Sequence, residues 1–345
     1  MDLRAREGDF LETKEGLIFD VKGLNHPPDR IIAYLRYYPN INGIRFRDGI
    51  RYEKIYSLTE RYTFLEKNYP HYLFNDKFSD ETLQGVPNED IKRIYRPDEF
   101  VKDILKKDQI KERNSWSAVL KKSLEMVKWI HLQSGVSYNK LGISGSVLVN
   151  LETEKSDIDL IIYGSKNARK VYESLSKIHN SPSELIHPYS EQEIGNLYEF
   201  RGQESNLSFQ EFVKIEGRKK LQGFFQGTEY YIRCIKDRNE IKYKYEEIQY
   251  KSLGQRTLSG VIIDDTEAIF TPCKYLFNLI KIDGIDTPKK LQEIASFRGR
   301  FCEQAKRGEA IEASGKVELV KSRKSEYYRF LIGSSQGDYF RVLNL

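Results

Sequence analysis

Two spacings of apolar residues recur along the chain, and they predict two kinds of secondary structure. Apolar residues in 116–130 recur at roughly helical spacing, which predicts an amphipathic helix of about five turns, capped at Asn114 or Ser115. Residues 228–235 alternate with period two, which is typical of a strand. Because helical and strand-like stretches are interspersed, we expect an α+β protein.

The first 108 residues are predicted to form a separate α+β module. Strands are expected at residues 16–21 and 30–38, and the pair Asp48-Gly49 predicts a hairpin. Helices are expected at 57–67 and after the turn signals at 86–90 and 96–99. A charged connection at 106–113 then leads into a second predicted domain, residues 109–245.

Residues 246–345 are predicted to form a β-rich, barrel-like domain. Turn signals separate short apolar runs at 258–263, 268–271, 274–282, 310–320, 327–332 and 339–343. One helix is expected at about 288–297, capped by Thr287. Short strands at this spacing are typical of a small barrel or sandwich. An OB-like barrel would bind nucleic acid; a partner-binding or purely structural barrel is the alternative.

The strongest chemical signal is Asp157 and Asp159, two carboxylates one residue apart that lead into an isoleucine-rich segment. A strand alternates its side chains, so both would lie on one face, about 6–7 Å apart along the strand. Ionised carboxylates at that separation repel each other, and a cation between them relieves the repulsion. Mg²⁺ prefers oxygen and takes one or two protein carboxylates together with water and phosphate. The sequence therefore predicts a metal site at Asp157 and Asp159.

A turn of the kind that binds phosphate, Ser144-Gly145-Ser146, precedes this pair. Glycine lets the backbone approach a bulky anion, and a following helical turn would present N–H groups to it. Ser146 adds a hydroxyl donor. Gly145 and Ser146 are therefore predicted to bind the phosphates of a nucleotide next to the metal.

The stretch 142–164 resembles the motif of the DNA polymerase beta-like nucleotidyltransferase superfamily. In that motif Gly-Ser is followed, after roughly ten residues, by Asp-hydrophobic-Asp-hydrophobic. The matching residues are Gly145-Ser146 and Asp157-Ile158-Asp159-Leu160, and Ser156 also fits the common form. The whole chain is similar to an archaeal group of predicted nucleotidyltransferases.

The resemblance implies a mixed-sheet catalytic core, a nucleoside triphosphate such as ATP as substrate, and Mg²⁺ or Mn²⁺ as the metal. It implies catalytic roles for Asp157 and Asp159 and for a third carboxylate on a later strand. Glu229 is the first candidate because it precedes an apolar strand, and Asp264 is the second. No hydrophobic-Asp-hydrophobic sequence marks this third carboxylate, which departs from the family pattern and leaves two-metal catalysis open.

A basic run, Arg218-Lys219-Lys220, is predicted to hold a triphosphate or an RNA backbone. A solvated loop is an equally good interpretation of the run. Two basic, aromatic stretches at 30–39 and 45–54 suggest a platform for nucleic acid. For these stretches a twisted sheet with solvated arginines is the favoured alternative.

Composition limits the classes of protein that need to be considered. The 345 residues carry a net charge of +5, which is compatible with a nucleic-acid or nucleotide partner. The three cysteines form no CxxC and are odd in number, which argues against a zinc site and a disulfide framework. No apolar run approaches the ~18 residues of a membrane span, and the charged first residues do not resemble a signal peptide. We therefore expect a cytoplasmic protein without a membrane partner.

These observations together predict a nucleotidyltransferase that moves a nucleoside monophosphate to an acceptor hydroxyl and releases pyrophosphate. RNA of a tRNA-like kind is the expected acceptor, because the flanking modules are basic and several members of the superfamily extend RNA 3′ ends. A protein-adenylylating enzyme and a non-catalytic RNA-binding protein on the same fold are the alternatives.

Overall fold

The computed structural model describes residues 4–179, 181, 183–202, 206–284, 291–335 and 337–343. The chain forms two compact units. The first consists of Met1–Lys77, Glu81–Ser174 and Phe225–Tyr245, and the second of Phe78–Asp80, Leu175–Phe224 and Glu246–Leu345. These two units are defined by packing and differ from the three predicted domains, which have boundaries after residues 108 and 245. Those domain boundaries stay a prediction.

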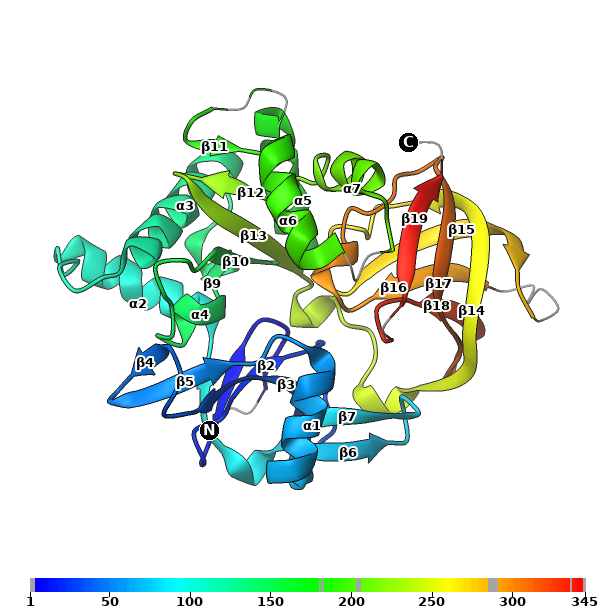
Figure 1. Cartoon of the computed structure of the whole chain (residues 1–345), viewed down its shortest axis with the longest axis horizontal. Coiled ribbons are helices and arrows are strands. Elements are labelled where there is room, and N and C mark those ends of the chain that lie inside the picture. Colours follow the sequence, from blue (N-terminus) through cyan, green and yellow to red (C-terminus); the bar gives the residue numbers. More distant parts are fainter. Residues whose placement is uncertain are drawn as a thin grey trace. The chain divides into compact units, whose positions relative to one another are not determined.

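An antiparallel sheet of eight strands occupies the N-terminal part of the first unit (Figure 1). Its strands are β1 (Phe10–Thr13), β2 (Ile18–Val21), β3 (Arg30–Pro39), β4 (Arg45–Arg47), β5 (Ile50–Lys54), β6 (Leu73–Asp76), β7 (Glu81–Pro87) and β8 (Ile91–Tyr95). The order is β4-β5-β3-β2-β1-β8, and β7 pairs with both β3 and β6. Helix α1 (Leu58–Asn68) begins after Ser57, whose side chain caps it, and buries Leu65 in the core of this sheet.

The predicted strands, hairpin and first helix of this part are confirmed. Asp48 and Gly49 both have positive φ, 51° and 81°, as a two-residue hairpin turn requires. The helix predicted after residues 86–90 is wrong, because only a 3-10 turn, Asn88–Asp90, forms before β8. Backbone pairing of β8 with β1 buries Ile91 and outweighs the local turn signal.

A second sheet in the first unit carries the Asp-Ile-Asp sequence. It contains β9 (Leu141–Ile143), β10 (Ile158–Tyr163) and β13 (Thr228–Ile235), in the order β13-β10-β9. Strand β10 runs parallel to β13 and antiparallel to β9. The accompanying helices are α2 (Pro97–Gln109), α3 (Ala118–Ser134), α4 (Gly145–Leu148) and α5 (Ser165–His179).

The helix predicted near residue 116 exists but begins later than expected. Helix α3 is capped by Ser117, whose hydroxyl accepts from the Leu120 N–H at 3.2 Å, and not by Asn114 or Ser115. The helix ends at Gly135, which adopts the left-handed conformation with φ 66°. The Ser117 hydroxyl thus satisfies a backbone N–H of the first helical turn, as an N-cap residue does.

Helices α6 and α7 and a closed barrel lie in the second unit. The helices are α6 (Glu191–Arg201) and α7 (Phe209–Glu216), and β11 (Ile186–His187) pairs with β12 (Gln222–Phe225). The barrel strands are β14 (Ile248–Asp264), β15 (Cys273–Ile282), β16 (Leu291–Ser296), β17 (Ala310–Ser322), β18 (Glu326–Leu331) and β19 (Tyr339–Leu343). They run in the order β14-β15-β16-β18-β17-β19, and the long β14 also pairs with β17, which closes the ring.

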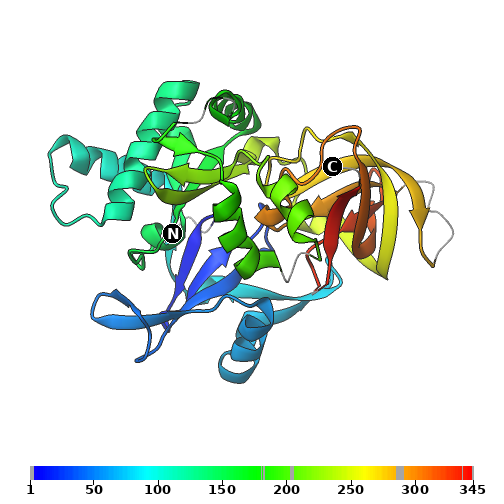
Figure 2. The ribbon, with the colours of Figure 1, turned by 45° about the horizontal axis from the view of Figure 1, so that its top comes forward.

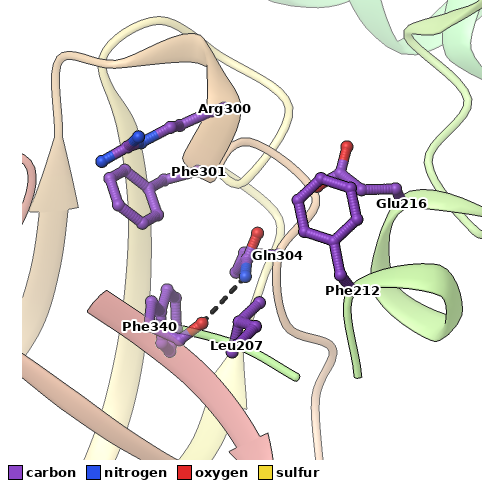
Figure 3. A pocket seen from close by; sticks show the side chains of 7 residues that line it. All are labelled: Leu207, Phe212, Glu216, Arg300, Phe301, Gln304 and Phe340. Carbon is purple, nitrogen blue, oxygen red and sulfur yellow. Dashed lines mark hydrogen bonds between the residues drawn. The ribbon is translucent and has the colours of Figure 1, made fainter. Parts of the chain in front are cut away.

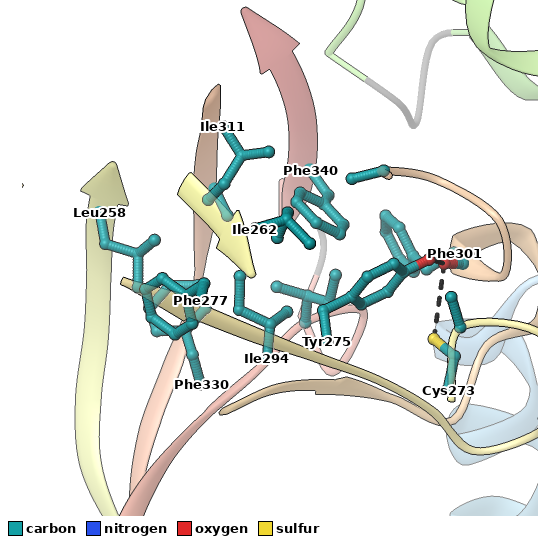
Figure 4. Close-up of a cluster of buried hydrophobic side chains, with 14 of the residues drawn as sticks. Leu258, Ile262, Cys273, Tyr275, Phe277, Ile294, Phe301, Ile311, Phe330 and Phe340 are labelled. Carbon is teal, nitrogen blue, oxygen red and sulfur yellow. Dashed lines mark hydrogen bonds between the residues drawn. The ribbon is translucent and has the colours of Figure 1, made fainter. Parts of the chain in front are cut away.

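The barrel confirms the predicted β-rich, barrel-like domain, and the helices and sheets together confirm the α+β class. Aromatic side chains fill the barrel. Tyr275, Phe277, Phe330 and Phe340 are buried together (Figure 4). Five of the six predicted strands are present; the one at 268–271 is wrong, because residues 266–269 form a turn.

The helix predicted at 288–297 is also wrong where the chain is described. Residues Leu291–Ser296 form β16, between β15 and β18, while 287–290 lie outside the described residues. Closing the barrel requires a strand at this place, and that requirement outweighs the helix-start signal.

Candidate active site

Asp157 and Asp159 flank the first residue of β10, as the sequence predicted. Both are half-buried, whereas Ile158 and Leu160 point into the core and are fully buried. Ile158 lies opposite Tyr230 and Asp159 opposite Tyr231 in the parallel pairing with β13. Because side chains alternate along both strands, the two carboxylates share their face of the sheet with Tyr231 and its odd-numbered neighbours.

Gly145 lies directly against the second carboxylate. Its φ is +64°, and a Cβ added to it would lie 1.9 Å from Asp159 Oδ2 and 2.8 Å from Asp159 Cγ. The Ser144 N–H donates to the Asp159 carbonyl at 2.8 Å and fixes this turn to β10. Only glycine satisfies both the backbone conformation and the close approach.

Ser146 uses its hydroxyl inside the turn. It is buried and donates to Ser156 Oγ at 3.1 Å, and Ser156 Oγ also accepts from the Thr153 N–H at 2.9 Å. The two serines of the motif therefore hold the connection between α4 and β10 in place. The predicted contact of Ser146 with a phosphate stays a prediction.

Burial is the largest cause that raises the pKa of Asp159, to about 7, and the charge of Asp157 adds to it. Three cations, Arg233, Arg36 and Lys54, act in the opposite direction. The carboxylate pair thus lies in a partly desolvated site, where ionisation of both Asp157 and Asp159 is disfavoured. A bound cation would relieve this.

Two of these cations, Arg36 and Lys54, come from the N-terminal sheet. The register between β2 and β3 shifts at Arg36, since Ile18 pairs with Tyr37 and Phe19 with Leu35. Arg36 is therefore the extra residue of a β-bulge, a feature that redirects side chains and is frequent beside active sites. Lys54 lies opposite Tyr37 in the pairing of β3 with β5.

Burial lowers the pKa of Lys54 to about 8, the charge of Arg36 lowers it further, and Asp157 raises it. Within the described part of the chain, the side chains of Arg36, Lys54, Asp157 and Asp159 form no hydrogen bond and no ion pair within 4 Å, although their charges influence one another. Two half-buried cations and two half-buried carboxylates thus influence one another electrostatically without direct contact. Neither Arg36 nor Lys54 was predicted as a site residue from the sequence, although both lie in the basic, aromatic stretches.

The hairpin of β4 and β5 lies beside α4 (Figure 1). Two buried arginines attach it to the turn that follows α4. Arg45 Nη1 donates to the Leu151 carbonyl, and Arg47 Nη1 donates to the Val149 carbonyl at 3.3 Å. An apolar cluster joins the same elements, with Tyr37, Tyr52, Leu148, Val149 and Leu151 among its members. The N-terminal sheet therefore positions its cations relative to the Asp pair through defined contacts.

Arg233 is held by acidic residues of the N-terminal sheet region. Its Nη1 lies 2.9 Å from Glu7 Oε1 and 3.7 Å from Asp20 Oδ1. Burial opposes its charge, but Asp20 and Glu7 raise the pKa of Arg233 above its usual range. The ion pairs of Arg233 with Glu7 and Asp20 connect β13 to this region.

The third carboxylate is less clearly defined than the pair. Glu229 is the second residue of β13 and precedes Tyr230, which lies opposite Ile158, so alternation puts Glu229 on the same face of the sheet as the Asp pair. Asp264, the other candidate, ends β14 in the second unit. The described residues contain no group of three or more His, Cys, Asp or Glu side chains that could hold a metal ion. The assignment of Glu229 therefore stays a prediction.

Arg218, Lys219 and Lys220 belong to the second unit and make contacts within it. Arg218 Nη2 donates to Glu309 Oε2 at 2.9 Å. Lys219 is buried and lies 2.7 Å from Glu216 Oε1, while Lys220 Nζ donates to Ser176 Oγ at 2.8 Å. A phosphate at this run would have to compete with these partners.

A small cavity in the second unit was not expected from the sequence. Gln304, Phe340 and Phe212 are among its lining residues (Figure 3). Its volume of about 20 Å³ has room for roughly one water molecule. It is too small for a nucleotide and adds nothing to the candidate site.

The chain is 31% identical to the uncharacterized protein MJ1086 of Methanocaldococcus jannaschii, and the alignment covers 99% of both chains. No protein-family model matches the chain. No solved structure matches it either. In the described part of the chain, no helix is both long and apolar enough to span a membrane.

Proposed function

The chain belongs to the family of MJ1086, and we propose that it is a metal-dependent nucleotidyltransferase of the polymerase beta-like kind. It moves a nucleoside monophosphate from a nucleoside triphosphate to a hydroxyl of RNA and releases pyrophosphate. One observation carries the proposal: the backbone of Gly145 touches the carboxylate of Asp159. This contact joins the two halves of the sequence motif in one site.

The side chains at this site suit a magnesium or manganese ion. Asp157 and Asp159 would hold it, since Mg²⁺ commonly takes one or two protein carboxylates and completes its coordination with water and phosphate. The disfavoured second charge on the pair supports a cation there. When bound, the ion supplies charge neutralisation for the phosphates and for the developing negative charge of the transfer reaction.

Arg36 and Lys54 bind the negative charge of the triphosphate in this proposal. Both are half-buried, influence the Asp pair electrostatically and have no carboxylate partner among the described residues. A polyphosphate chelated to a cation carries both signs of charge, so it matches two cations that face two carboxylates. Gly145 contributes by letting the Asp159 carboxylate lie directly against the backbone of the turn.

Transfer of labelled nucleotide tests the proposal directly. The protein is incubated with each α-³²P-labelled nucleoside triphosphate, Mg²⁺ or Mn²⁺, and total RNA. Label is expected in RNA with the intact protein and not with the Asp157→Asn/Asp159→Asn double variant. Asp103→Asn, on the exposed face of α2, is the matched control and should keep full transfer.

The other outcomes identify the alternatives. Label on a protein in place of RNA would indicate adenylylation of a protein acceptor. If no label moves and no triphosphate binds in the presence of either metal, the nucleotidyltransferase proposal is wrong. RNA binding without triphosphate binding would then favour the non-catalytic alternative.

A further inference from the structure

Tyr56 is an exposed aromatic residue beside the two cations of the candidate site. Its side chain is 54% exposed, whereas Tyr37 and Tyr52 of the neighbouring strands are buried. Lys54 Nζ lies over the Tyr56 ring, 4.6 Å from the centroid, and Arg36 Cζ lies 5.8 Å from the same centroid. Both distances are within the range of a cation–π interaction. One exposed ring thus adjoins both cations that bind the triphosphate in the proposed function.

Hydrogen bonds fix the backbone that carries this ring. Residues 55–57 connect β5 to α1, both drawn in blue in Figure 2. Arg61 Nη2 donates to the Ile55 carbonyl and to the Tyr56 carbonyl, at 3.1 Å in each case. Ser57, the next residue, caps α1. Because the segment is ordered by these contacts, less conformational entropy is lost when a ligand binds to the ring.

Packing connects the strand that leads to Tyr56 with the Gly-Ser turn. Lys54 lies opposite Tyr37 in the pairing of β5 with β3, and Tyr37 is buried in one cluster with Leu148 of α4. Helix α4 begins at the glycine of the Gly-Ser turn. Lys54 and Arg36 also act electrostatically on Asp159. The ring therefore lies beside cations that are within electrostatic range of the Asp pair.

A nucleoside triphosphate has two ends with different chemical requirements. Its phosphates need cations, whereas its base is a flat ring system that stacks on aromatic side chains. Only a ribose separates the base from the first phosphate, so an aromatic ring in contact with a phosphate-binding cation is within reach of the base. The Tyr56 ring, in contact with Lys54 and Arg36, has this position. Inorganic polyphosphate would use the cations and not the ring.

We propose that the base of the nucleoside triphosphate stacks on the exposed ring of Tyr56 while Arg36 and Lys54 bind the phosphates. This inference rests on the proposed function and specifies how that site holds the nucleoside. Every base has a π-face, so stacking accepts all four bases. It modestly favours purines, because their larger ring system overlaps more of the tyrosine.

Calorimetric titration in the presence of Mg²⁺ with two ligands, ATP and inorganic tripolyphosphate, tests this assignment. Tyr56→Leu is expected to weaken ATP binding about tenfold, the size typical of one lost base stack, and to leave tripolyphosphate binding unchanged. Tyr56→Phe keeps the ring and should bind both ligands like the intact protein. Tyr243→Leu, at another exposed tyrosine of the first unit, is the matched control and should also bind both ligands normally.

Unchanged ATP affinity in Tyr56→Leu would overturn this inference, whether or not nucleotide transfer is observed. A higher KM for RNA in that variant would then assign the ring to the acceptor. Equal weakening of ATP and tripolyphosphate would also overturn it, because the ring would then act only through Arg36 and Lys54. So would equal losses of ATP affinity in Tyr56→Phe and Tyr56→Leu, since the hydroxyl would then be the group that binds.

The same measurements separate this inference from the proposed function. ATP binding that depends on Tyr56, without any nucleotide transfer, would contradict the proposed function and support the stacking role. Transfer by the intact protein together with normal ATP binding by Tyr56→Leu would support the proposed function and overturn the stacking role. If the intact protein binds neither ATP nor tripolyphosphate with Mg²⁺ or Mn²⁺, both are wrong.

Discussion

Gly145 and Asp159 are in contact: a Cβ on Gly145 would lie 1.9 Å from Asp159 Oδ2. The glycine of the Gly-Ser turn and the second aspartate of the Asp-Ile-Asp sequence therefore form one structural feature. The absence of a side chain at position 145 permits the position of the carboxylate.

We expect Gly145→Ala to abolish metal-dependent triphosphate binding, because the methyl group must displace Asp159. Gly227→Ala is a close control, since Gly227 has a similar φ of +68° but nothing within 4 Å of an added Cβ. The control should lose only about 1 kcal/mol of stability from backbone strain. Calorimetric titration with ATP and Mg²⁺ measures binding, and chemical denaturation measures stability. Equal behaviour of the two variants would show that the contact with Asp159 is unimportant.

Arg36 and Lys54 are expected to bind the triphosphate. Arg36→Gln and Lys54→Gln should each weaken ATP binding about tenfold, which corresponds to ~1.4 kcal/mol. Arg218→Gln tests the other predicted phosphate site, and it should have a smaller effect because Arg218 already pairs with Glu309. The same titration compares all three variants. A larger loss in Arg218→Gln would assign the phosphates to the basic run at 218–220.

Arg47 is expected to stabilise the hairpin through a buried ion pair. Arg47 Nη2 lies 3.1 Å from Glu12 Oε2, and Lys92 Nζ lies 2.9 Å from Glu12 Oε1. Arg47→Met should lower the free energy of unfolding by about 3 kcal/mol, because it leaves a buried carboxylate with a weaker partner. Lys92→Met should cost about 1 kcal/mol or less, since Lys92 is 60% exposed. Urea denaturation of both variants measures the difference, and equal losses would contradict the assignment.

His26 is expected to make stability depend on pH. Its Nδ1 accepts from the Ile32 N–H at 3.3 Å and its Nε2 lies 3.2 Å from the Ala5 carbonyl, an arrangement that suits neutral imidazole. Burial lowers the pKa of His26 to about 4, so between pH 6.5 and 4 the unfolded chain binds a proton that the folded chain does not.

The His26 contribution is therefore lost as pH falls through this range and fully present above pH 6.5. It amounts to at most about 3 kcal/mol. Thermal or urea unfolding from pH 4 to 8 should show a smaller loss toward acid in His26→Gln than in the intact protein. His71→Gln, at an exposed histidine, is the control and should keep the full loss. An identical pH dependence in His26→Gln would contradict this prediction.

Several features of this protein could be predicted from the sequence because they depend on neighbours along the chain. Alternation of side chains places Asp157 and Asp159 on one face whichever strands surround them. The turn at Asp48-Gly49 needs only residues that tolerate positive φ. The alternating strands of the barrel carry their period in the sequence, so five of the six predicted strands were found.

Other features depended on contacts between distant segments. Residues Leu291–Ser296 form a strand because the barrel needs one between β15 and β18, and β8 forms because β1 provides a pairing partner. Local signals favoured helices in both places, and long-range hydrogen bonding outweighed them.

The sequence by itself determined the acidic pair and its glycine turn, because the spacing of a few adjacent residues encodes both. Only the tertiary structure decided which cations face them. Arg36 and Lys54 are placed within electrostatic range of the pair by a β-bulge and by a sheet that Arg45 and Arg47 anchor, although they lie more than a hundred residues away along the chain. Spacing along a sequence carries no information about such contacts, since they arise from the packing of one sheet against a loop of another.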